Sequence, residues 1–274
     1  MADPSKGSLN TATVREKWNL RQCIEGCARH GLGGIAPWRD KLAECGIDEA
    51  SRMIRDNGLT VTGLCRAGLF PASDAAAFQA NLDENRRAVD EAVAIDAECV
   101  VLVAGGLPVG SRDLPGARAQ VRDGIAATLE YARGVGMKLA IEPLHPMYAA
   151  DRACVNTLAH ANDLCDELGE GLGVAVDVYH VWWDPNVATE IARAGKDRIL
   201  AFHVCDWLVP TTDLLLDRGM MGDGVIDIPA IRAMVEATGF DGLYEVEIFS
   251  AENWWKRDPD EVLTTVVERL GSAV

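Results

Sequence analysis

The sequence predicts an α/β protein with a single domain, a (β/α)8 (TIM) barrel over residues 1–274. One pattern recurs along the chain: a short apolar run, a polar loop, an amphipathic helix and a glycine. The length and the 49% hydrophobic content suit one large domain, and no Pro/Gly/Ser-rich linker or charge block divides it. An open doubly wound sheet is the alternative, but no G-x-G-x-x-G motif follows the first strand.

The first half of the chain supplies four strand-and-helix units. Its predicted strands lie at 9–13, 33–36, 60–65 and 99–103. The fourth is rich in β-branched residues, which suits a parallel strand buried on both faces. The predicted helices lie at 14–30, 48–57, 75–96 and 115–133. Glycines follow three of them, as at many helix ends, and Asp74 is placed to cap the third.

The second half continues the pattern, and each of its four strands ends on a metal-binding residue type. The strands at 139–142, 173–177, 199–203 and 243–247 end on Glu142, Asp177, His203 and Glu247, and helices follow at 156–169, 187–196, 228–238 and 259–271. A charge at the edge of a core is costly unless a partner compensates. Two Glu, one Asp and one His suit a divalent metal, and barrel strand ends meet at one face. We therefore expect a metal site there; the alternative is four unrelated polar residues facing solvent.

Composition narrows the class of protein. A net charge of -16 argues against a nucleic-acid partner, because phosphates would be repelled. The eight cysteines form no CxxC pair and the start lacks an apolar signal core, so we expect reduced, buried thiols and a cytoplasmic location. Cys23 and Cys27, one helical turn apart, are expected to pack in the core. No apolar run approaches the ~20 residues that span a bilayer.

Histidines and an arginine follow the same strand ends. His145, three residues after Glu142, lies in an exit loop and could act as a general base or simply cap a carbonyl. His180, three residues after Asp177, could hydrogen-bond a substrate hydroxyl or orient a ligand. Arg66 follows the third strand and could reach over the rim, or remain a solvated loop residue.

Aromatic and glycine-rich segments also gather near strand ends. Trp18 falls in a predicted helix, and the other six tryptophans, Trp38 and Trp182 among them, follow strand ends. Indole faces bind the carbon face of a sugar or an aromatic ring. For Trp254 and Trp255, an oligomer interface or a cover of the barrel is equally consistent. The glycine-rich loop 217–227 is expected to form a mobile cover, from which Arg218 could meet substrate oxygens.

These motifs resemble the xylose-isomerase-like sugar phosphate isomerase/epimerase superfamily over nearly the whole chain. The matching segments are Asn85-Arg86 with Glu91-Ala92, Ile141-Glu142-Pro143, Asp177-x-x-His180, His203-x-x-Asp206, Gly222-Asp223-Gly224-x-Ile226-Asp227 and Val246-Glu247. The resemblance implies that Glu142, Asp177, His203 and Glu247 hold one divalent metal, often manganese. Mn2+ is therefore the expected cofactor, with Co2+ or Mg2+ as alternatives.

A narrower resemblance is to the larger subunit of C-glycoside deglycosidases, lyases that act on 3-keto-glycosides. It rests on the segment 142–152, on Trp182-Trp183-Asp184-Pro185 and on the segment 218–224. It implies a small β-rich partner subunit and an oligomer. Ketose 3-epimerases, in contrast, carry an arginine three residues beyond the histidine motif, where this chain has Trp207-Leu208-Val209 after Asp206.

The expected reaction begins with removal of a proton next to a sugar carbonyl, where a bound metal would act as a Lewis acid. In the lyase hypothesis, which the missing arginine favours, His145 takes the proton and the C1 substituent of a 3-keto-glycoside leaves. In the alternative, a sugar isomerase or ketose 3-epimerase, Glu142 and Glu247 work from opposite faces of the carbon. A third hypothesis is a non-catalytic sugar-binding subunit.

Overall fold

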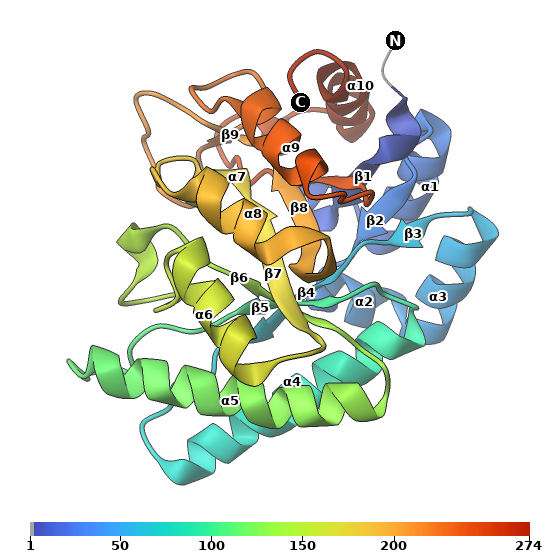
Figure 1. Ribbon diagram of the computed structural model, residues 1–274. Coiled ribbons are helices and arrows are strands. Elements are labelled where there is room, and N and C mark those ends of the chain that lie inside the picture. The colour runs from blue at the N-terminus through green and yellow to red at the C-terminus, as the bar shows by residue number, and fades with distance from the viewer. Residues whose placement is uncertain (1–2) are drawn as a thin grey trace.

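The parallel strands of the computed structural model, which describes residues 3–274, close into a barrel surrounded by helices (Figure 1). The main sheet has the strand order β3-β2-β1-β11-β8-β7-β6-β5-β4. We call each of the eight strand positions around the barrel a stave. Because β3 and β4 are two halves of one stave, the strand order begins and ends on that stave. Two isolated parallel bridges connect the halves of this stave to the strands on either side: Trp38, which follows β2, pairs with Cys65 of β4, and Val61 of β3 pairs with Ala97, which precedes β5. The predicted (β/α)8 barrel is confirmed.

The strands lie close to their predicted positions. Their bounds are β1 Gly7–Asn10, β2 Gly34–Ala36, β3 Thr60–Val61, β4 Leu64–Gly68, β5 Val100–Val103, β6 Leu139–Glu142, β7 Leu172–Asp177, β8 Ile199–Val204 and β11 Tyr244–Val246. The third predicted strand is interrupted at Thr62 and Gly63, and its second half extends to Gly68. Arg66 therefore lies within β4 and not beyond the strand, as the sequence had suggested.

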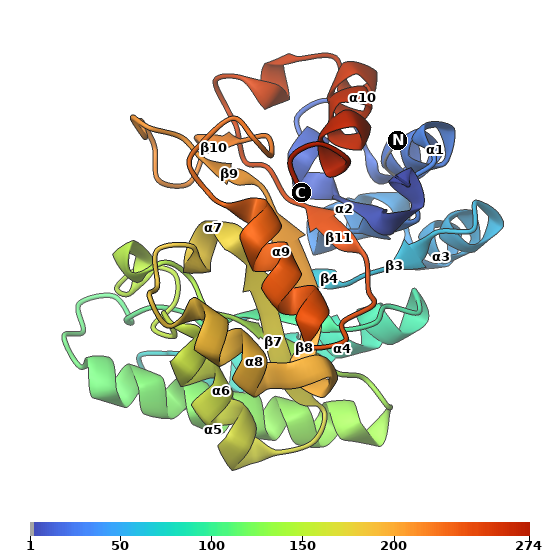
Figure 2. The ribbon, with the colours of Figure 1, turned by 45° about the horizontal axis from the view of Figure 1, so that its top comes forward.

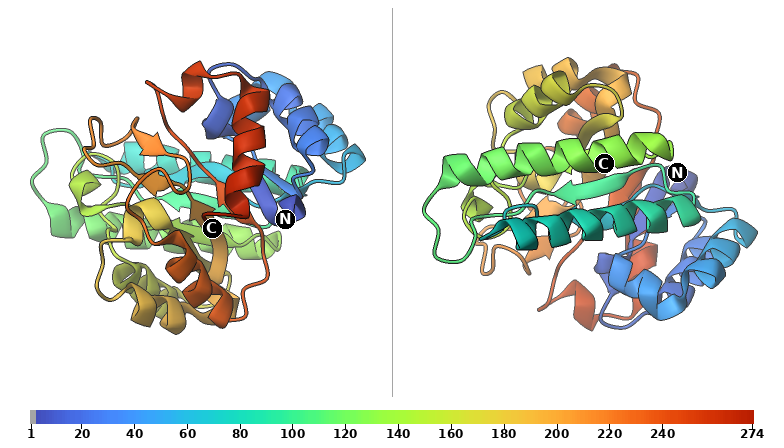
Figure 3. Two further views of the ribbon diagram at one scale, coloured as in Figure 1. Left: turned by 90° about the horizontal axis from the view of Figure 1, so that it is seen from above. Right: turned by 90° about the horizontal axis from the view of Figure 1, so that it is seen from below.

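The helices form the outer layer. Their bounds are α1 Leu20–His30, α2 Arg39–Cys45, α3 Ile47–Asp56, α4 Ala75–Ala94, α5 Leu114–Gly134, α6 Leu158–Leu168, α7 Val178–Val181, α8 Val187–Arg198, α9 Ile228–Ala237 and α10 Pro259–Leu270. Asp74 accepts a hydrogen bond from the backbone N–H of Ala77, as expected of the cap of α4. The two longest helices, α4 and α5, pack side by side, as the view from below in Figure 3 shows.

Two helix predictions were wrong. The first helix begins at Leu20 and not near residue 14, because Thr11–Val14 forms a 3-10 turn and Asn19 closes a capping box with Gln22. Trp18 therefore precedes the helix. The prediction also missed α2, which is separated from α3 by Gly46 with a φ of +87°. Glycine adopts a positive φ more readily than other residues, so Gly46 can end α2 directly before α3 begins.

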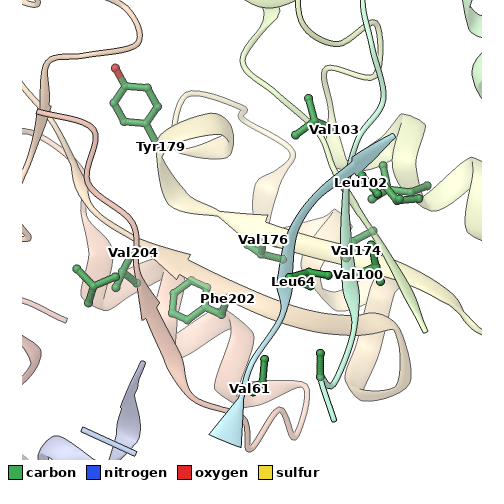
Figure 4. Close-up of a cluster of buried hydrophobic side chains, with 14 of the residues drawn as sticks. Val61, Leu64, Val100, Leu102, Val103, Val174, Val176, Tyr179, Phe202 and Val204 are labelled. Atoms are coloured by element: carbon green, nitrogen blue, oxygen red, sulfur yellow. The ribbon is translucent and has the colours of Figure 1, made fainter. Parts of the chain in front are cut away.

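Successive side chains of each barrel strand point alternately toward the helices and into the barrel, so the apolar residues form an outer and an inner layer. Outward-facing residues of the strands, such as Val100 and Leu102 of β5 and Val174 and Val176 of β7, belong to the large core shared with the helices (Figure 4). The residues between them form a separate, smaller cluster inside the barrel: Cys99, Val101, Ala140, Ala175 and Ala201. The interior alanines leave room for the larger polar groups carried by other staves.

Burial and hydropathy agree with the remaining expectations. All eight cysteines are free and buried, and Cys23 and Cys27 belong to the large core. No helix within residues 3–274 is long and apolar enough to cross a membrane. Beyond the barrel's carboxyl end, β9 Asp206–Trp207 and β10 Arg218–Gly219 pair antiparallel, and Figure 2 shows this small sheet near α7.

Candidate metal centre and active site

Four side chains from adjacent staves meet inside the carboxyl end of the barrel. Glu142 ends β6, Asp177 ends β7, His203 lies in β8 and Glu247 directly follows β11. One oxygen or nitrogen atom of each lies within 4.8 Å of those of the other three, and all four residues are buried. The β7–β8 register pairs Asp177 with His203. Alternation along each strand turns all four side chains into the barrel.

A buried arginine faces this cluster. Arg218 of β10 is 3% exposed, and its Nη1 donates to Asp177 Oδ2 and to Glu247 Oε2, both at 3.1 Å. Its guanidinium also lies over the rings of Tyr179 and Phe249, at 4.4 and 5.1 Å from their centroids. The arginine therefore neutralises part of the charge of the cluster and fixes the direction of two carboxylates.

The electrostatics of the cluster leave a demand for further positive charge. Burial acts to raise the pKa of Asp177, but Arg218, His180 and His203 outweigh it and hold this pKa below its usual range. Burial raises the pKa of Glu247 to about 8, against the opposing effect of Arg218. Burial acts to lower the pKa of His203, but Glu245 and Glu142 outweigh it and raise this pKa well above its usual range. The buried acids thus hold protons on Glu247 and His203, and a bound cation could take the place of those protons.

The donor set fits a divalent metal ion. Carboxylate oxygens and an imidazole nitrogen are ligands of Mn2+, Co2+ and Zn2+. His203 Nδ1 lies 3.0 Å from Glu142 Oε1, so the nitrogen faces the carboxylates that would share the ion. The set would be completed by two oxygens of a substrate or by water.

The glycine-rich segment after Arg218 is anchored by hydrogen bonds to Asp206. The carboxylate of Asp206 accepts hydrogen bonds from the backbone N–H groups of Gly222, Gly224 and Ile226, at 2.8 to 3.0 Å. Met220 and Met221 are fully buried. Within the segment 217–227, Arg218 to Met221 are buried and residues 222–225 are exposed, so the segment carries Arg218 into the protein interior. That it acts as a mobile cover stays a prediction.

The two histidines occupy different depths. His180 is buried, and burial lowers its pKa to about 3. The backbone N–H of His145 donates toward His180 Nδ1 at 3.1 Å, and the Arg218 guanidinium directs its Nη2 donor at His180 Nε2, also at 3.1 Å. A neutral imidazole has a single acceptor nitrogen, so only one of these two contacts can be a hydrogen bond at a time. The His145 ring packs further out, with ring centroids 5.5 Å from Trp183 and 5.2 Å from Trp207.

A small cavity opens onto the cluster. Its free space is about 40 Å³, and its lining consists of Trp38, Cys65, Arg66, Val103, Glu142, Leu144, Tyr148, Arg152, His180, Leu215, Arg218, Glu247 and Phe249. Larger cavities exist, including one of about 650 Å³ bordered by Lys138, Lys196 and Asp241. That cavity lies at the amino-terminal ends of the strands, whereas barrel active sites occupy the carboxyl ends. Another, of about 500 Å³, lies beyond the carboxyl ends of β4 and β5, but none of the four cluster residues borders it.

Only some of the residues that the sequence proposed for catalysis or substrate binding line this cavity. Trp38, Arg66, His180 and Arg218 line the cavity, whereas His145 and Trp182 lie outside that lining. The Trp182 ring packs 5.7 Å from that of Trp207.

Sequence reasoning missed several polar residues of this region. Glu245 lies two residues before Glu247, so the two-residue period of a strand would have placed it on the same interior face. Tyr148 and Arg152 of the cavity lining come from the exit loop after β6. Asn10 ends β1 and is fully buried. No local pattern marks it, because it carries no charge.

The barrel and its buried ring of acids and a histidine define a class: (β/α)8 proteins with a metal-binding donor set at the carboxyl ends of the strands. Comparison with known families specifies which one. The sequence profile of the xylose isomerase-like TIM barrel family matches residues 24–266, and the chain belongs to that family.

Several known proteins are similar over nearly their full length. An inosose isomerase of Bacillus velezensis is 23% identical, with 97% of this chain and 96% of the relative covered. The crystal structure of protein SMc04130 from Sinorhizobium meliloti 1021 has a TM-score of 0.96 and 61% identity, covering 97% of each chain. A structure of the IOLI protein with a zinc atom gives 0.81 and 21%, covering 98% and 99%. The 3-keto-D-glucoside 4-epimerase of E. coli gives 0.76 and 20%, covering 97% and 98%.

Proposed function

We propose that this protein is a metal-dependent isomerase or epimerase that moves a proton on a carbon next to the carbonyl of a sugar or cyclic polyol. The carrying observation is the contact between Arg218 and Glu247 Oε2 at 3.1 Å. The sequence favoured a lyase because an arginine expected to hold the second glutamate was missing after Asp206. Arg218 reaches that glutamate from β10 instead, so this objection to an epimerase no longer applies. The names of the inosose isomerase and the 3-keto-D-glucoside 4-epimerase support the same class.

The residues divide the work as follows. A divalent ion held by Glu142, Asp177, His203 and Glu247 would supply Lewis acidity to the carbonyl oxygen and its neighbouring hydroxyl. Glu142 and Glu247 come from different staves, β6 and β11, and so approach a substrate carbon from different directions. One carboxylate removes the proton and the other returns one to the opposite face. Arg218 keeps Glu247 aimed into the cavity.

The cavity walls position the substrate. Trp38 and Phe249 are in edge contact at 5.5 Å between ring centroids and present an apolar wall suited to the carbon face of a sugar ring. His180 and the guanidinium of Arg66 line the same cavity and can hydrogen-bond to the hydroxyl groups of a sugar.

A second candidate is the lyase acting on 3-keto-glycosides, together with its small β-rich partner subunit in a hetero-oligomer. The observation that favours it is the aromatic cavity wall of Trp38, Tyr148 and Phe249, which suits an aromatic aglycone. His145 would be the base in that reaction, although reaching the substrate requires it to leave its packing between Trp183 and Trp207.

The deciding experiment follows the proton itself. Mn2+-loaded protein is incubated in D2O with an inosose, D-fructose, D-psicose and a 3-keto-glucoside carrying a phenolic aglycone, and NMR detects deuterium at the carbon next to the carbonyl. We expect exchange and an epimer or isomer with at least one of them, strongly reduced in Glu247→Gln and unchanged in Glu98→Gln, a carboxylate at the other end of the barrel. Aglycone release that His145→Ala abolishes would instead support the lyase. Binding of these compounds with neither exchange nor release would indicate a non-catalytic subunit and contradict the proposal.

A further inference from the structure

A further buried carboxylate, in addition to the three of the candidate metal centre, lies one layer of interior side chains below that centre. Glu245 of β11 is 1% exposed and precedes Glu247 by two residues, so both side chains point into the barrel. The β11–β8 register pairs Glu245 with His203. The carboxylate oxygen Oε1 of Glu245 lies 3.4 Å from His203 Nε2.

This carboxylate is held from two other staves. Asn10 Nδ2 donates to Glu245 Oε1 at 2.7 Å, and the Thr62 hydroxyl donates to Oε2 at 2.7 Å. Because the one proton of Thr62 is used in this way, the Ser8 hydroxyl, 2.9 Å from Thr62 Oγ1, must donate to Thr62. Asn10 Nδ2 also donates to Glu247 Oε1 at 3.0 Å. The same amide thus ties the lower carboxylate to a member of the candidate metal centre.

The imidazole of His203 lies between the two layers. Its Nδ1 is 3.0 Å from Glu142 Oε1, on the side of the four-residue cluster. Its Nε2 is buried and has no hydrogen-bond partner within residues 3–274 that meets normal geometry. Glu245 Oε1, at 3.4 Å, is close enough that a small rotation and shift of the two side chains would align it with an Nε2–H.

A histidine ligand can give only one nitrogen to a metal, and that nitrogen must be unprotonated. If Nδ1 faces the ion, the proton of the neutral ring must sit on Nε2. A buried carboxylate that accepts this proton fixes the tautomer, the ring orientation and the basicity of the ligand.

We propose that Glu245 is a positioning residue for His203: it accepts a hydrogen bond from Nε2–H and so holds the lone pair of Nδ1 toward Glu142, Asp177 and Glu247. Asn10 and Thr62 fix Glu245 in turn. The inference rests on the metal-dependent function proposed above, but it concerns binding of the ion and not the reaction.

Zn2+ is the probe, because it is diamagnetic and permits NMR of the loaded protein. In wild-type protein carrying 15N-labelled histidine, we expect the His203 signals to show a metal-bound Nδ1 and a protonated Nε2 with a downfield, slowly exchanging proton. The His203→Asn variant identifies these signals. A loaded His203 that carries its proton on Nδ1, or a protein that binds no Zn2+, would overturn the inference.

Affinity supplies the second measurement. Glu245→Gln keeps the shape but removes the charge, and second-layer partners of this kind typically change metal affinity about 10- to 100-fold. We expect Zn2+ binding, measured by competition with a chelator, to weaken by that factor, whereas Glu98→Gln retains wild-type affinity. A folded Glu245→Gln protein that binds Zn2+ within about twofold of wild type contradicts the proposal.

Two further outcomes are informative. If Glu245→Gln fails to fold, Thr62→Val and the wild-type NMR spectrum decide, because Thr62→Val frees one carboxylate oxygen without removing the charge. It should broaden or shift the Nε2–H signal, and an unchanged signal would count against the proposal. Zn2+ binding with the expected tautomer but no proton exchange on any sugar would defeat the proposed function and leave this inference intact.

Discussion

Arg218 illustrates how one residue can settle the electrostatics of a site. It is 3% exposed and its Nη1 contacts two buried carboxylates, Asp177 and Glu247. Placing three acids together in a barrel is unfavourable by itself, and a guanidinium between two of them offsets part of that cost. The remaining charge is what a divalent ion would balance. Arg218 and the ion are therefore both expected to stabilise the folded protein by offsetting the negative charge of the same carboxylates.

This dependence can be tested with Arg218→Met. Removing one partner of a buried ion pair typically costs about 3–5 kcal/mol. We expect the variant to lose free energy of unfolding by about that amount in EDTA, measured by urea denaturation. In saturating Zn2+ the loss should be smaller, because the ion takes over part of the neutralisation.

The control is Arg52→Met, which removes an exposed pair between Arg52 and Asp56 within α3. Exposed pairs contribute about 0–1 kcal/mol, so this variant should behave like the wild type with or without the ion. An Arg218→Met protein whose loss is the same in EDTA and in Zn2+ would show that the arginine and the ion do not share this role.

At the scale of elements, the strands with the strongest pattern were the easiest to predict. The run Leu139 to Glu142 forms β6 with the expected bounds, since an apolar strand that ends on an acid and a proline admits few other structures. The third strand was harder. Its break at Thr62 and Gly63 depends on which neighbour each half pairs with, β2 or β5, and such pairing is not a local property of the sequence.

The residues of the candidate site were likewise predictable only where a local pattern marks them. Glu142, Asp177, His203 and Glu247 could be collected from the sequence because each ends an apolar run, and the structure brings them together. Arg218 could be singled out but not placed. It lies in β10, and its inward position accompanies the antiparallel pairing of Arg218 with Trp207 of β9, which no local pattern predicts. The strand period could have placed Glu245 on the interior face, but its hydrogen bond with Asn10 joins two strands that are distant in the sequence, and no local spacing encodes that contact.

The segment 219–227 depends on Asp206 for its shape, which leads to a second prediction. Asp206 Oδ2 accepts the N–H groups of Gly222 and Gly224, and Oδ1 accepts those of Trp207 and Ile226. Asp206→Asn must direct an amide NH2 at one of these pairs of donors. We expect a loss of about 2–4 kcal/mol in the free energy of unfolding, because two hydrogen bonds are lost and each hydrogen bond to a charged acceptor contributes about 1.5–3 kcal/mol, less where, as at Gly222 and Gly224, the donor is only partly buried. Hydrogen exchange at Gly222 and Gly224 should become faster.

Asp213→Asn is the matched control for that substitution. Asp213 accepts the N–H groups of Leu215 and Leu216 through the same oxygen, Oδ1. An asparagine can keep that oxygen in place and lose neither bond. If Asp206→Asn and Asp213→Asn proved equally stable, the hydrogen bonds of Asp206 would not be what holds the segment.

At the scale of the whole molecule, the barrel brings a costly set of charges into the interior of an already acidic protein. The chain carries a net charge of -16, and its surface gains little from exposed ion pairs. The three acids of the four-residue cluster and Glu245 beneath it bring four acidic groups into the interior, where Arg218 and His203 face them. Stability should therefore be more sensitive to a divalent ion than to ordinary salt.

Metal removal tests this at the level of the entire fold. At an ion concentration 100 times the Kd, binding to the folded state alone adds about 2.7 kcal/mol, which corresponds to roughly 5–10 °C in Tm for a domain of this size. We expect Mn2+ or Zn2+ to raise Tm by that amount over protein in EDTA, and Asp177→Asn to abolish most of the difference. NaCl at equal ionic strength should have a much smaller effect, because the cluster is buried and poorly screened. A rise in Tm that persists in Asp177→Asn would place the ion elsewhere, and the cluster would then require another explanation for its buried charge.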